Sequence, residues 1–166
     1  MNLSFSRKIK KENTYFPEKI IRGLELLEYK KMTLLDFLYE VTPESEWMDI
    51  TDFQKLTPKI TTLREDKKDR WKSGNDIHFV INNRTPQRFK FAPVVKCVST
   101  QNVSVTNNPK NGRYITIRED NESRILCPEK EKLVAINDGF HSVDDFYSWF
   151  NQDWNGKIIH WTNLKY

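Results

Sequence analysis

Three side chains that could do chemistry lie within six positions of the segment PKITTLRED: Lys59, Thr62 and Arg64. A threonine hydroxyl is a weak nucleophile until a base removes its proton, and a partly desolvated lysine with a lowered pKa is such a base. Arginine offers a rigid fork of donors that suits an oxygen-rich ligand. These residue types therefore fit either acyl transfer or the binding of a polar ligand.

The spacing of the three residues sets a condition on the backbone. Side chains alternate between the two faces of a strand, so Thr62 and Arg64 share a face, whereas Lys59 and Thr62 point to opposite faces. Lys59 meets Thr62 only where the chain bends between them, and Pro58 favours a change of direction at this point. Without that bend, the segment is a charged strand end and no shared site forms.

The positive charge of the chain is concentrated in one block. Lys and Arg number 8 against 10 Asp and Glu over residues 1–54, 10 against 4 over 55–90, and 9 against 9 over 91–166. Basic charge attracts phosphates, and an aromatic ring can stack on a base. The predicted ligand contacts in this block are Arg64, Lys67, Lys68, Arg70, Trp71 and Lys72. The alternative is a solvated loop in which Trp71 is a packing residue.

Composition places the chain among folded proteins without a membrane span. It has 166 residues, of which 13% are aromatic and 30% charged, as expected of one globular domain. No apolar run approaches the roughly 18–20 residues of a membrane helix, and no apolar stretch follows the basic N-terminus, so we expect a cytoplasmic protein. The cysteines and histidines lack zinc-ligand spacing and no cofactor motif is present, so neither metal nor cofactor is expected.

The hydrophobic pattern predicts short strands and few helices. Helices are expected over residues 14–27, 33–41 and 141–154, the last with Ser142 as its N-cap. Strands are expected over residues 2–6, 76–82, 88–105, 114–117, 124–126, 132–137 and 157–164. Asn111-Gly112 predicts a hairpin. The result is an α+β protein built as a small mixed β-barrel with flanking helices, and residues from about 28 to 56 form a helical insertion.

The segment PKITTLRED, followed by RWKSGNDI, resembles the signature of the ASCH domain, a family whose β-barrel is similar to the PUA RNA-binding fold. The family pattern of Lys, Thr and Arg followed by Gly falls on Lys59, Thr62, Arg64 and Gly74. FPEKIIRGL and INDGFHSVDDFYSWF also resemble segments that flank this motif in the family. The resemblance covers most of the chain and treats residues 1–166 as a single ASCH-like domain.

This resemblance implies a barrel groove that binds RNA, a nucleotide or a modified nucleoside. Some small bacterial members are amidohydrolases that act on acetylcytidine and use a Lys, a Thr and a Glu. Lys59 and Thr62 match the first two, and Asp138 falls at the third position with a side chain one methylene shorter. Asn137-Asp138-Gly139 also has the composition of a plain turn before a helix, which is the alternative interpretation of Asp138.

Three functions follow as hypotheses. The first is binding of RNA or a nucleoside, which the basic block favours wherever the candidate catalytic residues lie. The second is hydrolysis of an N-acylated nucleoside, with Thr62 as nucleophile, Lys59 as base and Asp138 positioning groups or acting on the leaving amine; it requires every member to be in place. The third is a protein-interaction module of a phage or mobile element, with the insertion at 28–56 binding a protein partner.

Overall fold

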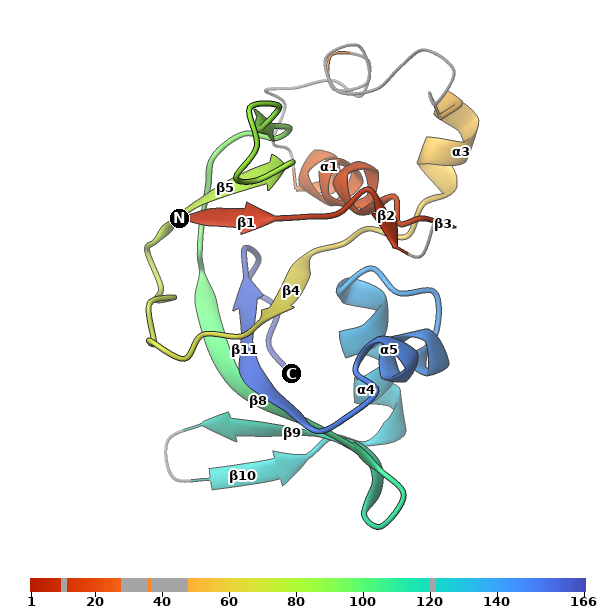
Figure 1. The fold of residues 1–166 in the computed structure, drawn as a ribbon, viewed down its shortest axis with the longest axis vertical. Helices are drawn as coiled ribbons and strands as arrows, with labels where there is room; N and C mark the ends of the chain where they lie inside the picture. Colours follow the sequence, from red (N-terminus) through yellow and green to blue (C-terminus); the bar gives the residue numbers. More distant parts are fainter. Residues whose placement is uncertain (10–11, 28–35, 37–47, 120–121) are drawn as a thin grey trace. The chain divides into compact units, whose positions relative to one another are not determined.

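A computed structural model describes residues 1–9, 12–27, 36, 48–119 and 122–166 of the chain (Figure 1). They form a mixed α+β structure, as predicted, and in this part of the chain no sheet closes into a barrel. The chain folds into two compact units, one of residues 1–59 and 76–96, the other of residues 60–75 and 97–166. None of the described helices has both the length and the apolar character needed to cross a membrane.

The first unit is built around strand β5 (Asp76–Ile81). Strand β1 (Asn2–Ser4) pairs with it in parallel, and β6 (Phe89–Lys90) and β7 (Val95–Lys96) pair with it antiparallel. A separate two-stranded sheet joins β2 (Lys8–Ile9) to β3 (Glu12–Asn13). The rings of Phe5, Phe79 and Phe91 lie with centroids 6.0–6.1 Å apart in the interior. The strands predicted at 2–6 and 76–82 are therefore confirmed.

Helix α1 (Phe16–Leu26) also belongs to the first unit. Pro17 lies in its first turn, where a missing N–H leaves no helical hydrogen bond unmade, and Ile20, Ile21 and Leu24 are buried. Helix α3 (Ile50–Lys55) begins after Asp49, whose side chain accepts a hydrogen bond from the Thr51 N–H at 2.7 Å. The helix predicted from residue 33 to 41 lies outside the described residues except for position 36, as does most of the insertion at 28–56.

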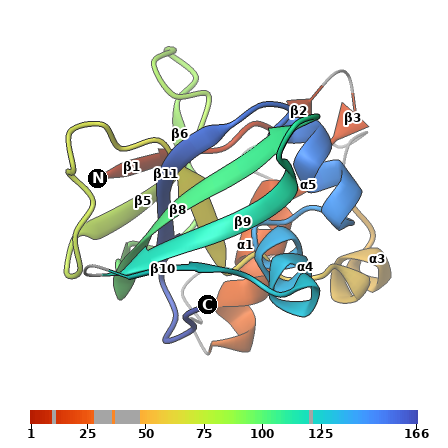
Figure 2. The same ribbon diagram turned by 90° about the horizontal axis from the view of Figure 1, so that it is seen from below.

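The second unit contains a five-stranded antiparallel sheet in the order β10-β9-β8-β11-β4 (Figure 2). Its strands are β4 (Thr61–Arg64), β8 (Ser99–Asn108), β9 (Gly112–Glu119), β10 (Glu122–Ile125) and β11 (Trp154–His160). The predicted Asn111-Gly112 hairpin joins β8 to β9, and Gly112 has a φ of 79°, which an L side chain rarely adopts. Strand β4 forms one edge of this sheet.

Two helices pack on one face of that sheet. Helix α5 (Val143–Trp149) confirms the core of the helix predicted over residues 141–154, but it ends at Trp149, and Trp154 begins β11. The Ser142 hydroxyl accepts a hydrogen bond from the Asp145 N–H at 3.0 Å. Helix α4 (Pro128–Asn137) packs beside it in the same core. The buried residues shared by helices and sheet include Val134, Ala135, Phe146, Tyr147, Val103, Val105, Ile115 and Ile117.

The strand predicted at residues 132–137 was wrong, because this segment is the second half of α4. Six residues are too few for an apolar run to distinguish a strand from a buried helix by periodicity. The segment buries Val134 and Ala135 and exposes Leu133, which fits a helix that packs along one side. Pro128 occupies its first turn and is the signal that would have favoured a helix.

Candidate functional site

Strand β4 carries Thr62 and Arg64, and the sheet fixes their orientation. Thr62 is opposite Ile159 and Arg64 is opposite Lys157 in the pairing with β11. The two side chains share a face, as their spacing predicted. Thr62 exposes only 3% of its surface, whereas Arg64 is half-buried.

Asp138 lies against the same strand, although it is far away in the sequence. Its Oδ1 accepts a hydrogen bond from the backbone N–H of Leu63 at 3.3 Å, and the backbone N–H of Ile60 donates to the carbonyl of Asn137 at 3.1 Å. Asp138 is buried at the C-terminus of α4 and is followed by Gly139, whose φ is 93°. The segment is thus a turn, and it also fixes a carboxylate at the edge of β4 that lacks a partner strand among the described residues.

Arg64 and Asp138 interact electrostatically. Burial lowers the pKa of the Arg64 guanidinium, and the negative charge of Asp138 opposes that change. The guanidinium remains charged because the ordinary arginine pKa lies far above neutral pH. The second unit therefore brings Thr62, Arg64 and Asp138 together along β4.

Lys59 belongs to the first unit, and its described contacts lie there. It exposes 1% of its surface, its Nζ lies 5.0 Å from the ring centroid of Phe16 and 5.6 Å from that of Phe5, and its N–H donates to the carbonyl of Lys19 at 3.0 Å. Attraction between an ammonium and aromatic faces stabilises this placement. Its role as a base for Thr62 stays a prediction.

The basic run directly follows β4 as an exposed loop. All four of its predicted cationic contacts are exposed: Lys67, Lys68, Arg70 and Lys72. Three of them form ion pairs within the loop: Lys67–Glu65 at 3.0 Å, Arg70–Asp66 at 4.0 Å, and Lys72–Asp69. Ion pairs at the surface are worth about 0–1 kcal/mol, so these cations can exchange a carboxylate for a phosphate at little cost.

Trp71 does not share that exposure. It exposes 4% of its surface, its backbone N–H donates to Oδ2 of Asp66 at 2.8 Å, and its backbone carbonyl accepts a hydrogen bond from the ammonium of Lys157 at 3.0 Å. A ring buried to this degree has little face left for a base. The structure favours the packing alternative for Trp71.

Sequence reasoning missed Lys157, a buried lysine that donates hydrogen bonds to the loop that follows β4. It exposes 8% of its surface, and its ammonium donates to Oδ1 of Asp69 and lies 3.8 Å from Oδ2 of the buried Asp66. We call Lys157, Asp66, Asp69 and Trp71 the Lys157 cluster. Hydrogen bonds from Lys157 and then Lys72 lower the pKa of Asp69 to about 2. A lysine at the start of an apolar strand gives no sequence signal of such burial.

Comparison of the chain with known protein families, curated proteins and solved structures found no match. The ASCH resemblance therefore depends only on the sequence segments quoted above.

Proposed function

We propose that this chain is an ASCH-like domain that binds RNA or a nucleotide-containing ligand, with the phosphates held by the loop that follows β4. One observation carries the proposal: the cations of residues 65–75 are exposed immediately after the strand that presents Arg64. Phosphate binding by exposed cations releases counterions, which makes affinity depend steeply on salt.

The loop is suited to this role because its cations are held loosely. Lys68 has no ion-pair partner among the described residues, and the pairs of Lys67 and Lys72 lie at the surface, where solvent weakens such pairs. The Lys157 cluster anchors the loop from beneath, so the exposed cations project from a fixed backbone.

Neutralising the loop should weaken RNA binding and flatten its salt dependence. In the triple variant Lys67→Ala, Lys68→Ala and Arg70→Ala, we expect affinity for single-stranded RNA to fall at least tenfold at low salt. Each lost phosphate contact should reduce the slope of log K against log salt by about 0.7. Fluorescence anisotropy with a labelled oligonucleotide between 50 and 200 mM salt measures both quantities.

The matched control removes three exposed lysines of the same unit that lie away from the loop: Lys110→Ala, Lys130→Ala and Lys132→Ala. This control changes the net charge equally and should retain most of the affinity. The proposal fails if both triple variants lose affinity to the same extent, or if the native chain does not bind RNA at low salt.

Hydrolysis of an N-acylated nucleoside is the second candidate, and it is supported by the position of Asp138. The Asp138 carboxylate accepts a hydrogen bond from the backbone N–H of Leu63, the residue directly after Thr62. In such a reaction the Thr62 hydroxyl would lose its proton to a base and attack the acyl carbonyl, the amine would leave with a proton, and water would then cleave the acyl ester. We rank it second because a nucleophile must reach its substrate and Thr62 is 3% exposed.

Thr62→Val tests this second candidate because valine retains the branched shape and lacks the hydroxyl. Hydrolysis of acetylcytidine, followed by chromatography of released cytidine, should fall to the uncatalysed background, while RNA affinity stays unchanged. Thr100→Val, a partly buried position on β8, is the matched control. Equal turnover in the native chain and Thr62→Val would exclude Thr62 as the nucleophile.

A further inference from the structure

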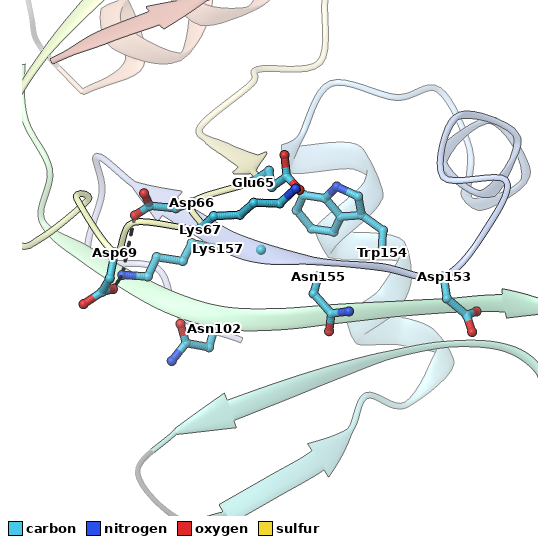
Figure 3. Close-up of a pocket in the computed structure, with 10 residues that line it drawn as sticks. Glu65, Asp66, Lys67, Asp69, Asn102, Asp153, Trp154, Asn155 and Lys157 are labelled. Atoms are coloured by element: carbon cyan, nitrogen blue, oxygen red, sulfur yellow. Dashed lines mark hydrogen bonds and ion pairs between the residues drawn. The ribbon is translucent and has the colours of Figure 1, made fainter.

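A pocket with a volume of about 480 Å³ lies in the second unit, beside β11 (Figure 3). It is bounded by residues 153–157, by Asn102 of β8 and by the first residues of the loop after β4. Strand β4 pairs only with residues 157–160 of β11, so no strand of the described chain covers residues 154–156 on that side. The pocket lies beside this unpaired part of β11, and its volume suits a small molecule.

The wall of the pocket combines an aromatic surface with free amides. Trp154 lines the pocket and is half-buried. The centroid of its ring lies 4.9 Å from that of Phe150. Asn102 and Asn155 are exposed, and their side-chain amides make no hydrogen bond within the described residues. An indole offers a stacking surface for a base, and each amide offers both donors and an acceptor, as the edge of a base requires.

The charge of the lining argues against a phosphate inside the pocket. Four carboxylates line it, those of Glu65, Asp66, Asp69 and Asp153, against the two ammonium groups of Lys67 and Lys157. Lys157 already donates a hydrogen bond to the carbonyl of Trp71. It also contacts Asp69 and Asp66, as Figure 3 shows. Glu65 pairs with Lys67, and Asp153 accepts hydrogen bonds from Asn107 and Asn108. The lining still carries more negative than positive groups, which disfavours an anion, and carboxylate oxygens have further lone pairs that can accept hydrogen bonds from sugar hydroxyls.

We propose that this pocket binds one unpaired nucleobase with its ribose, while the phosphates stay outside on the exposed cations of residues 67–72. The inference rests on the proposed RNA-binding function and specifies its ligand: an unpaired nucleotide whose base enters beside Trp154. The Lys157 cluster supplies a rigid wall, so the site is formed before the ligand arrives.

The test titrates free cytidine, uridine, adenosine and guanosine into the ¹⁵N-labelled full chain. We expect the amide resonances of Asn102 and of residues 153–157 to shift on addition of at least one nucleoside. The 5′-monophosphate of that nucleoside should bind at least as tightly as the nucleoside itself, because its phosphate can reach the exposed cations of residues 67–72. The double variant Asn102→Ala and Asn155→Ala should lose at least tenfold in nucleoside affinity, whereas Asn151→Ala with Asn163→Ala, two exposed amides outside the pocket, should not.

The outcomes separate this proposal from the one it rests on. If RNA binds with the expected salt dependence but no nucleoside moves these resonances, the pocket assignment is overturned and the phosphate-binding loop stands. If nucleosides bind and RNA does not, the pocket assignment stands and the role of the loop is overturned. Weaker binding of the monophosphate than of the nucleoside would overturn the placement of the phosphates on those cations. Shifts with an oligolysine peptide alone would reassign the pocket to a basic protein segment.

Discussion

Gly156→Ala is expected to lower the free energy of unfolding by about 3 kcal/mol, at the upper end of the usual cost of overpacking. A Cβ at this position would lie 2.4 Å from the backbone carbonyl oxygen of Arg64 and 2.3 Å from Cη2 of Trp154. The Arg64 carbonyl belongs to β4, which is paired with β11, and the Trp154 indole packs on Phe150. Neither neighbour can move away without breaking another contact.

Chemical denaturation of the native chain and the variant measures this change. Gly112→Ala is the control, because Gly112 has open space around its Cα and a φ of 79°. That substitution costs only the strain of a left-handed alanine, about 1 kcal/mol. A Gly156→Ala variant within about 0.5 kcal/mol of the native chain would show that β4 and Trp154 lie further from Gly156 than described.

Local sequence signals predicted those elements whose cause is itself local. The hairpin follows from Asn111-Gly112, because a positive φ is needed where the chain reverses. Ser142 predicted the start of helix α5, because its hydroxyl accepts a hydrogen bond from the Asp145 N–H. The start of α1 follows from Pro17. Each signal lies within a few residues of the structure it specifies.

Placement that depends on distant residues was harder to predict. The alternation of side chains gave the shared face of Thr62 and Arg64, but only the family resemblance suggested that Asp138 joins them. The Lys157 cluster forms across 88 residues between Asp69 and Lys157, and no spacing in the sequence reports it. Gly156 looks like an ordinary strand glycine until the carbonyl of Arg64 is seen to approach it.

The basic block shows how charge counts can mislead about contacts. The sequence assigned Trp71 and its cationic neighbours to one ligand surface. The structure separates them, since Trp71 is buried and the cations around it are exposed. A tally of charges identifies where an anionic ligand would approach, but burial decides which aromatic ring can meet it, and Trp154 is better placed than Trp71 for that role.

As the pH falls from 6.5 to about 4, the buried His160 should lower the free energy of unfolding of the protein. Burial lowers the pKa of its imidazole to about 4 from an ordinary 6.5, the charge of Lys165 lowers it further, and that of Glu119 opposes this. Within this interval the unfolded chain binds a proton that the folded chain does not, so the free energy of unfolding decreases as pH falls. The contribution is fully present above pH 6.5, and its loss at low pH amounts to about 3 kcal/mol.

Two substitutions separate the titration of His160 from its polarity. Both ring nitrogens lack a hydrogen-bond partner in the described chain, and the side chain is completely buried beside Tyr166, with ring centroids 5.8 Å apart. His160→Leu should remove the pH-dependent loss and match or exceed the native stability at pH 7, because no satisfied hydrogen bond is given up. His160→Gln should also remove the loss, but it should be less stable than His160→Leu by about 1–3 kcal/mol, since its amide stays buried without partners.

Urea denaturation at several pH values from 7 to 4 measures the three curves, with His141→Gln as the control at an exposed histidine. The carboxylates of the chain also titrate in this range, so the informative quantity is the difference between the native chain and His160→Leu. That difference should grow towards low pH because only the native chain must keep an uncharged imidazole in its core. If the two curves run parallel from pH 7 to 4, His160 gains its proton as readily in the folded chain as in the unfolded one, and its burial does not control acid stability.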